Sequence, residues 1–261
     1  MSRPIVFCTD YGTRDEFVGV CHGVMATIAP DARVIDLMHA IPRQDVMRGA
    51  LVLSRAVPYM PEDAVYCAVV DPGVGSERRA LAIASASGAM LVGPDNGLLS
   101  LAWEVLGGPE AAYLIASPGI VLSPMSQTFH GRDVFAPAAA HLATGVRVDT
   151  IGPAVDVSTL HTLEVMGPMV APGAIGARVI GVDGFGNVQL NATRDHLKAA
   201  GIAEMLGVAG HEVPLVSTFT DLAPHGLGAI VDSQGFVALV VNQGSAAEML
   251  HLGEGSTVVI E

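Results

Sequence analysis

Positive charge is scarce in this sequence of 261 residues. Thirteen Lys and Arg stand against 26 Asp and Glu, which gives a formal net charge of -13 at pH 7. We therefore expect no nucleic-acid partner held by a basic surface. Charged residues make up only 15% of the chain and hydrophobic residues 51%, so the chain can bury a large core and is not expected to be disordered.

Cysteine is also rare, and long apolar runs are missing. Cys8, Cys21 and Cys67 form no CxxC pair, and two of them lie in apolar, strand-like runs. We interpret them as small buried residues, and such an odd, scattered set fits a reducing compartment. The sequence begins without a signal-peptide pattern and has no run long enough to span a membrane. We therefore expect a cytoplasmic protein with no membrane partner.

Several common catalytic motifs do not occur. The chain has no GxxxxGK[ST] phosphate loop, no GxGxxG after its first strand-like run and no GxSxG turn. Its histidines show neither HExxH nor a paired zinc-ligand spacing. Nucleoside triphosphates, Rossmann-type dinucleotides and a structural zinc are therefore disfavoured, and we predict no metal and no cofactor.

Strand and helix patterns alternate through the first half of the chain. Apolar runs predict strands over 5–9, 33–37, 65–70, 81–84 and 90–92. Helical spacing predicts helices over 13–28, 46–57, 98–106 and 134–143, the first opened by a capping box of Thr13 and Glu16. This alternation predicts a layered α/β domain over residues 1–155 with a mostly parallel sheet.

The second half has a different character. Residues 156–173 are rich in proline and weakly patterned, so we interpret them as a connection between domains. Short β-like runs then recur with Gly, Asp or Asn between them, at 177–182, 213–219, 229–231, 236–241 and 257–260. One short helix is predicted over 194–199. Residues 174–261 are therefore predicted to form a smaller all-β, barrel-like domain.

Four polar turns of the first half carry the residues that could do chemistry. In a parallel sheet these turns share the carboxyl edge, which would bring together Asp10, Asp71, Arg78, Asn96 and His130. A group of Asp, Arg and His can hold and polarise a water molecule. The histidine takes a proton near neutral pH, the carboxylate orients it, and the arginine stabilises developing hydroxide.

Each of these residues also has an ordinary structural explanation when taken alone. Asp10 can cap a turn, His130 can be a structural histidine, and Arg78 can be surface charge. Three later segments also have two possible interpretations: 183–191, 232–235 and 242–247. They are either hairpin turns or the polar, glycine-lined edge of a pocket for a base or an amino acid.

Five motifs in order carry a resemblance to one family. They are Thr9-Asp10-Tyr11-Gly12, Asp71-Pro72-Gly73-Val74-Gly75, Gly93-Pro94-Asp95-Asn96-Gly97, Phe129-His130-Gly131-Arg132-Asp133 and Asp183…Phe185-Gly186-Asn187…Asn191. The set resembles the S-adenosyl-L-methionine (SAM) hydroxide adenosyltransferases, the adenosine-forming SAM hydrolases of the superfamily that includes the SAM-dependent fluorinase and chlorinase. The resemblance spans nearly the whole chain.

The resemblance implies an α/β N-terminal domain, a β-barrel-like C-terminal domain and a homotrimer. Each SAM site would lie between the N-terminal domain of one subunit and the C-terminal domain of its neighbour. The implied reaction is attack of water or hydroxide on the ribose C5′ of SAM, which gives adenosine and L-methionine. The sulfonium is a good leaving group, so neither a metal nor a covalent enzyme intermediate is required.

The resemblance also implies roles for individual residues. Asp71, Arg78 and His130 match the triad that separates hydrolases from halogenases. Asp10 would hold the ribose hydroxyls, and other residues would face the methionine part (Asp15, Asp183 and Ser233) or adenine (Asn187 and the backbone at Ala246 and Ala247). The same motifs place Tyr11, Asn96, Gly131 and Phe185 among the substrate-binding residues.

Two departures from the family pattern stand out. The stretch after Ser233 lacks an acidic residue that relatives often carry, and Gln189 stands where halogenases have an aromatic residue. Two alternatives to the hydrolase are a SAM- or adenosine-binding protein without turnover and a SAM-dependent halogenase. The triad favours the hydrolase, because a pure binder has no need of a water-activating group.

Overall fold

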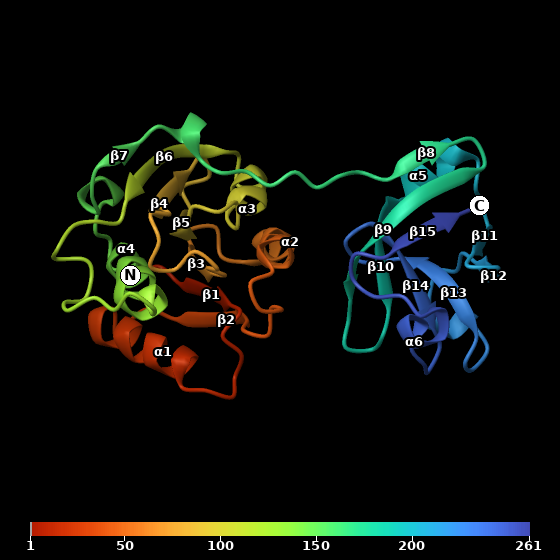
Figure 1. The fold of residues 1–261 in the computed structure, drawn as a ribbon, viewed down its shortest axis with the longest axis horizontal. Coiled ribbons are helices and arrows are strands. Elements are labelled where there is room, and N and C mark those ends of the chain that lie inside the picture. The colour runs from red at the N-terminus through yellow and green to blue at the C-terminus, as the bar shows by residue number, and fades with distance from the viewer. Residues whose placement is uncertain (1) are drawn as a thin grey trace. The chain divides into compact units, whose positions relative to one another are not determined.

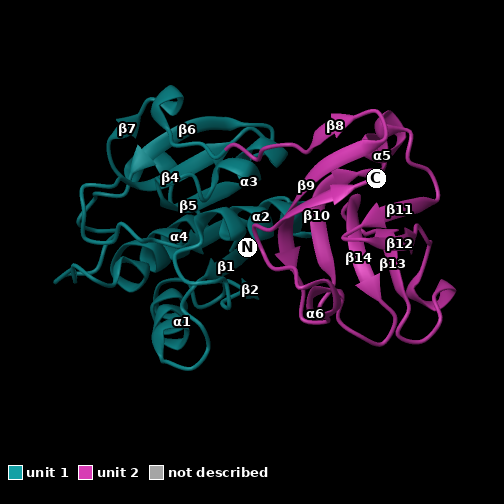
Figure 2. Ribbon diagram, turned by 45° about the vertical axis from the view of Figure 1, so that its right-hand side comes forward, with its two compact units in different colours: residues 1–163 teal, residues 164–261 magenta. Residues whose placement is uncertain are grey.

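A seven-stranded sheet forms the centre of the first of two units, in a computed structural model that describes residues 2–261. The two units are Met1–Leu163 and Glu164–Glu261 (Figure 2). The strand order in the first is β2-β1-β3-β5-β4-β6-β7. The strands are β1 (Ile5–Thr9), β2 (Val34–Met38), β3 (Val65–Val69), β4 (Ala80–Ser85), β5 (Met90–Pro94), β6 (Pro109–Leu114) and β7 (Ala154–Val155).

Helices cover both faces of this sheet (Figure 1). One face packs against α1 (Phe17–Ile28) and α4 (Ala136–Ala143), and the other against α2 (Val46–Ala56) and α3 (Ser100–Val105). Because successive strand residues point to opposite faces, Ile5 and Phe7 enter the first core and Val6 and Cys8 the second. Short helical turns complete the unit: η1 (Val57–Tyr59), η2 (Gly131–Phe135), η3 (Val148–Thr150) and η4 (Val157–Thr159).

The first sheet is only partly parallel, which corrects the sequence prediction. Strands β2, β1, β3 and β5 run parallel, whereas β4 pairs antiparallel with β5 and β6, and β6 pairs antiparallel with β7. Only residues 86–89 join β4 to β5, too few for the crossover that parallel strands need. β4 nevertheless starts at the edge where β3 ends, so the loop 71–79 lies at the carboxyl edge.

Two local predictions in the first half were also inexact. The capping box of Thr13 and Glu16 is wrong: α1 begins at Phe17, and its N-cap residue Glu16 makes no capping bond through its side chain. The helix predicted over 134–143 begins within η2, a π-helical turn, and its α-helical part is α4. The three cysteines are free and buried as predicted, and burial raises the pKa of Cys8 and of Cys21 to about 12.

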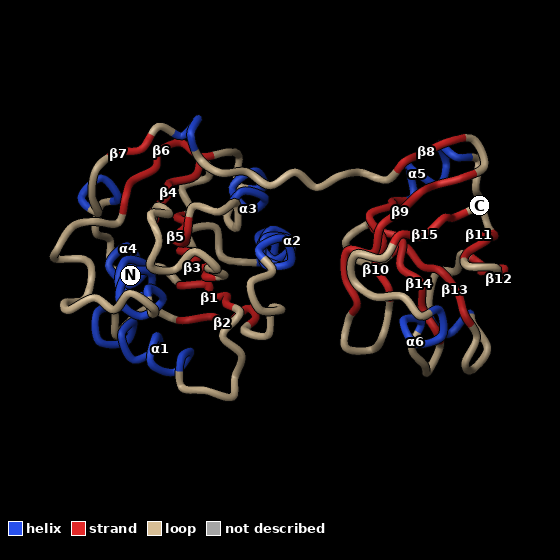
Figure 3. The backbone as a smooth tube through the Cα atoms, viewed as in Figure 1, coloured by secondary structure: helices blue, strands red, loops and turns tan. Residues whose placement is uncertain are grey.

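The second unit is one antiparallel, nearly barrel-shaped sheet (Figure 3). Its order is β12-β11-β15-β9-β10-β14-β13, with β8 paired to β9. Leu215, just past β12, bridges to Ala229 on β13, so the two end strands meet. The strands are β8 (Met169–Ala171), β9 (Ala174–Val182), β10 (Val188–Thr193), β11 (Met205–Val208), β12 (His211–Pro214), β13 (Leu227–Val231), β14 (Phe236–Val241) and β15 (Thr257–Ile260).

Short helices interrupt this second sheet. The predicted helix is α5 (Arg194–Ala200), which opens with a capping box of Thr193 and His196. The segment 242–247, for which a hairpin turn was one of two interpretations, ends inside the helix α6 (Ala246–Leu250). A 3₁₀ turn, η5, spans Phe219–Asp221. Among the described helices, none combines the length and the apolar character needed to cross a membrane.

Candidate active site

Three segments of the first unit bring the predicted triad together. Asp71 follows the carboxyl end of β3, and Arg78 stands just before β4 at the other end of the same loop. His130 is the residue that precedes η2. The loop can pack closely because Gly75 has a φ of 78°, and a Cβ there would lie only 2.5 Å from the carbonyl oxygen of Gln127.

Asp71 and Arg78 form a buried, multiply hydrogen-bonded ion pair. The Arg78 Nε donates to both carboxylate oxygens of Asp71 at 3.0 Å, and Nη2 donates to Oδ2 at 2.5 Å. The side chains are only 6% (Asp71) and 11% (Arg78) exposed. The guanidinium carbon also lies 5.1 Å from the centre of the Phe135 ring. Arg78 is therefore held in one orientation by groups on two sides.

The same guanidinium determines the protonation of His130. Arg78 Nη2 lies 2.7 Å from His130 Nδ1. A guanidinium can only donate, so Nδ1 must accept, and the ring proton of the neutral imidazole belongs on Nε2. Burial, reinforced by the charge of Arg78, lowers the pKa of His130 below 6.5. Among the described residues the buried Nε2 has no hydrogen-bond partner, so it remains a free donor.

A cavity of about 530 Å³ adjoins this cluster, within the range of small-molecule sites. Asp71 and His130 line it, but among the described residues that line it Arg78 is absent. Arg78 therefore stands behind the two and holds both. The cavity is lined by Asp10, Tyr11, Glu16, Phe17, Val69, Asp71, Val74, Ser126, Thr128, Phe129, His130, Gly131 and Arg132.

An aromatic group forms part of the cavity lining. The rings of Tyr11, Phe17 and Phe129 meet edge to face, with centroids 5.2–6.1 Å apart. Tyr11 packs so tightly on Gly131 that a Cβ at this glycine would lie 1.9 Å from the phenol oxygen. Burial raises the pKa of Tyr11 well above its usual value, so the phenol stays neutral.

Two charged groups at the cavity are fixed by neighbouring residues. Asp10 accepts a hydrogen bond from the backbone N–H of Gln44 at 2.8 Å. Arg132 lies over the Phe129 ring and donates to Asp133 at 2.6 and 2.9 Å. Burial of Asp133 opposes its ionisation, but the bonds from Arg132 and from the Ser126 N–H lower the pKa of this carboxyl overall.

Sequence reasoning missed several residues of this cavity. Phe129 stands in the same motif as His130, so the motif itself could have indicated it. Glu16 and Phe17 were assigned to the start of a helix, and nothing in their spacing marks them as cavity residues. Val69, Val74, Ser126 and Thr128 carry no signal of their own because apolar and hydroxyl residues are common in any loop.

Two predicted binding residues of the first unit lie outside the described lining. Asp15 is exposed in the segment before α1. Asn96 uses both ends of its amide within the protein, donating from Nδ2 to the carbonyl of Val70 at 2.9 Å and accepting at Oδ1 from the Leu98 N–H at 3.1 Å. In this structure Asn96 therefore ties the end of β5 to the end of β3.

The remaining predicted residues belong to turns of the second unit. Asp183 Oδ1 accepts from the N–H groups of Phe185 and Asn187, both at 2.9 Å, and Oδ2 accepts from Asn187 Nδ2 at 2.8 Å. The Ala247 N–H donates to the Gly186 carbonyl at 3.0 Å, so the turn 183–187 meets the start of α6.

The turn 232–235 is connected to β10. Gln189 donates from Nε2 to the Asp232 carboxylate, which stands beside the exposed Ser233. Phe185 is 82% exposed. The structure thus joins Asp183, Asn187 and Ala247 in one cluster within this unit, next to Ala246, and leaves the Phe185 ring in solvent.

Comparison with known proteins agrees with this architecture. Residues 5–152 match the SAM hydroxide adenosyltransferase N-terminal domain and residues 177–259 the C-terminal domain. An (R)-S-adenosyl-L-methionine hydrolase from Salinispora arenicola is 50% identical over 96% of this chain and 95% of its own length. One from Thermus thermophilus is 42% identical over 98% of each chain.

More distant relatives complete the comparison. A fluorinase from Actinopolyspora mzabensis is 29% identical over 98% of this chain and 97% of its own. A crystal structure of an uncharacterised conserved protein from Thermotoga maritima, 32% identical, superposes with a TM-score of 0.90 and covers 98% of this chain and 99% of that one. The chain belongs to the SAM hydroxide adenosyltransferase family.

Proposed function

We propose that this protein hydrolyses SAM to adenosine and L-methionine by attack of water or hydroxide on the ribose C5′. The observation that carries the proposal is the buried Asp71–Arg78–His130 cluster, which borders a ligand-sized cavity in a member of this family. The two relatives described above that are named as SAM hydrolases are 50% and 42% identical over nearly the full chain. Fluorinases are more distant, which favours water over halide as the nucleophile.

The hydrogen-bond directions support a division of roles. Asp71 borders the cavity, and a carboxylate keeps lone pairs beyond those that Arg78 occupies, so it can accept the proton of an attacking water. His130 cannot use Nδ1 as a base, because Arg78 donates to it. Its Nε2–H instead donates to the water oxygen, leaving one lone pair for attack on C5′. Arg78 acts as a positioning residue that fixes both partners.

The character of the cavity also suits SAM. The sulfonium carries a positive charge, and the lining supplies the carboxylates of Asp10, Glu16 and Asp71 against the single cation Arg132. Aromatic rings stabilise cations, and Tyr11, Phe17 and Phe129 lie on the same cavity. In this proposal Asp10 holds the ribose hydroxyls, and Tyr11 and Gly131 shape the wall next to it.

We further propose that the site is completed by the second unit of a neighbouring copy in a homotrimer. Asp183 and Ser233 would face methionine, and Asn187 with the backbone of Ala246 and Ala247 would face adenine. Asp15, Asn96 and Phe185 are the remaining proposed substrate contacts. The resemblance to the family supports this assignment. The proposed reaction needs no cofactor or metal, because the sulfonium leaves without assistance, and we propose the cytoplasm, where SAM is made and used, as its location.

Product analysis tests the proposed activity. Purified protein is incubated with SAM, and adenosine and methionine are separated by chromatography; we expect equal amounts of both. Tight SAM binding with no product above the spontaneous background would instead identify a binding protein. Formation of 5′-halo-adenosine on addition of chloride or fluoride would identify a halogenase.

A further inference from the structure

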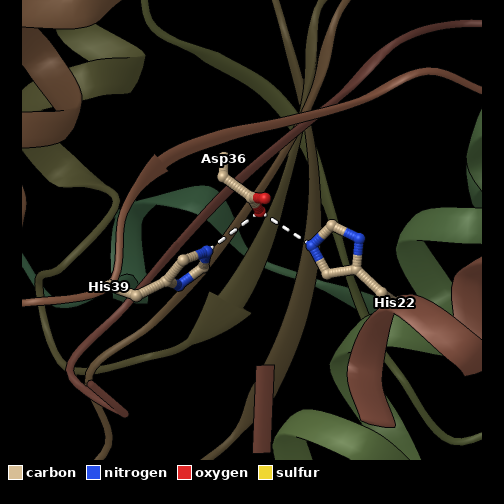
Figure 4. A group of neighbouring side chains, drawn as sticks. All are labelled: His22, Asp36 and His39. Carbon is tan, nitrogen blue, oxygen red and sulfur yellow. Dashed lines mark hydrogen bonds and ion pairs between the residues drawn. The ribbon is translucent and has the colours of Figure 1, made fainter. Parts of the chain in front are cut away.

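Outside the proposed active site, three side chains from separate elements converge on one point (Figure 4). His22 lies on α1, Asp36 on β2, and His39 directly after β2. The Nε2 atom of His22 lies 2.8 Å from Asp36 Oδ1, and that of His39 lies 2.9 Å from the same oxygen. The three side chains and the lining of the cavity have no residue in common.

These separations match those of ligands that share a metal ion. Zinc binds imidazole nitrogen and carboxylate oxygen at about 2.0–2.2 Å. Two such ligands at angles between 90° and 109° lie about 2.8–3.6 Å apart. The observed distances of 2.8 and 2.9 Å fall at the short end of this range. The ligand atoms of all three residues lie within 4.8 Å of one another, so an ion at their centre could replace the two shared protons.

The surroundings hold the two rings in suitable orientations. His39 Nδ1 lies 2.8 Å from the hydroxyl oxygen of Thr9, which is fully buried. A histidine that binds a metal through Nε2 carries its proton on Nδ1 and usually donates it to a neighbouring group, and Thr9 is placed to receive it. The Phe7 ring contacts both imidazoles, with centroids 5.9 Å from His22 and 4.9 Å from His39.

Charge and exposure also fit a cation with free coordination positions. Asp36 supplies a carboxylate, and both imidazoles already hydrogen-bond to one of its oxygens. His39 is 7% exposed, whereas His22 and Asp36 are 33% and 47% exposed. The buried ligand anchors the site, and the open side leaves room for water to complete the coordination shell.

We propose that His22, Asp36 and His39 bind one Zn²⁺ ion, with water in the remaining positions. Imidazole and carboxylate together suit this class of ion. The ion joins α1 to β2 next to the loop 10–12, because His39 also accepts the Gly12 N–H at its carbonyl oxygen at 2.6 Å. It supports the loop and takes no part in the reaction, so the proposal stands or falls independently of SAM hydrolysis.

Metal content of the full-length protein tests this site. Protein stripped with a chelator is dialysed against a small excess of Zn²⁺, and bound metal is measured by mass spectrometry. We expect one Zn²⁺ per chain. In His22→Gln and Asp36→Asn the affinity for Zn²⁺ should fall by more than about 10-fold. Mutation of a residue that only hydrogen-bonds to a ligand already costs about that much, and these substitutions remove a ligand itself. Both substitutions are at part-exposed positions, and circular dichroism of the stripped proteins checks that they fold.

Controls separate the proposed site from adventitious binding. His211→Gln removes an exposed histidine of the second unit and should bind Zn²⁺ as the unaltered protein does. Thr9→Val keeps all three ligands and should weaken binding by about 10–100-fold. Co²⁺ gives an independent readout, since its visible absorption should appear in the unaltered protein and vanish in His22→Gln. Zinc retention that is absent, or equal in His22→Gln and His211→Gln, would overturn the proposal.

Discussion

Two clusters in the first unit combine Asp with His, and only one of them contains an arginine. Asp71 and His130 are joined through Arg78, which donates to both. In the second cluster both histidines make direct hydrogen bonds to Asp36. In the first cluster burial and the nearby guanidinium lower the pKa of a histidine, and in the second the histidines lower the pKa of a carboxyl.

The difference shows how one cation decides what a group of His and Asp can do. With Arg78 present, positive charge is already supplied, the histidine is neutral, and an added metal ion would meet electrostatic repulsion. The arrangement therefore suits the positioning of a neutral water. The second cluster has no arginine between its members, and its carboxylate and imidazoles gather three potential ligand atoms around one point, which suits a cation that displaces the shared protons.

The largest expected effect comes from removing the anion of the first cluster. Asp71→Ala leaves the Arg78 charge buried without its partner, so the free energy of unfolding should fall by about 3–5 kcal/mol. Urea denaturation measures it. The control is Asp149→Ala, which breaks a solvent-exposed pair with Arg147 and should lower the free energy of unfolding far less, because water screens the charges of an exposed pair. Equal losses would contradict the buried role of Arg78.

The next prediction separates the two nitrogens of His130. In His130→Asn the amide can still accept from Arg78 but has lost the Nε2 donor, and kcat should fall by about 10²–10⁴-fold. His130→Gln places an amide near Nε2 and should retain more activity. Steady-state kinetics with SAM measures both variants. Greater activity in the Asn variant would mean that the contact with Arg78, and not the Nε2 donor, carries the function.

A smaller effect is expected from crowding the cavity wall. In Gly131→Ala the new Cβ would lie 1.9 Å from the Tyr11 oxygen, so the ring must move, and overpacking of this kind costs about 1–3 kcal/mol. We expect a higher KM and a lower thermal midpoint. Gly119→Ala, where a Cβ meets open space, is the control. Unchanged kinetics in Gly131→Ala would show that Tyr11 does not shape the substrate site.

The smallest expected effect is a shift in pH dependence. Because the pKa of His130 is below 6.5, the neutral ring persists as pH falls through 6.5, and kcat/KM should decline only below that value. The same lowered pKa stabilises the folded state above pH 6.5, and that contribution declines as pH falls below 6.5, where the unfolded histidine gains a proton first. An acid limb centred above 6.5, or one that persists in His130→Asn, would contradict this assignment.

The sequence predicted most of the fold because its strands follow buried, apolar runs. β14 and β15 were predicted residue for residue, whereas β6, which contains Pro109 and Glu110, was missed for want of a strand-like composition. Parallel pairing was overestimated because strand direction depends on the length of connections. The connection between β4 and β5 is too short for a parallel crossover, and its length alone indicates an antiparallel pair.

The candidate site was likewise predicted only in part from the sequence. Asp71 and Arg78 were predicted because polar residues and glycines mark the ends of strands, and His130 because it stands in a polar turn before a predicted helix. The exclusion of Arg78 from the cavity lining depends on side-chain packing, which no spacing encodes. His22, Asp36 and His39 were passed over because they belong to a helix, a strand and a bend, so no local ligand spacing links them.

Isotopic labelling tests the central proposal most directly, namely that the cluster around Arg78 directs water to C5′ of SAM. The reaction is run in H₂¹⁸O with SAM and the products are weighed by mass spectrometry. We predict that the 5′-hydroxyl of adenosine carries ¹⁸O, that methionine carries none, and that His130→Asn forms the labelled adenosine far more slowly. Unlabelled adenosine, label in methionine, or an equal rate in the variant would contradict the account.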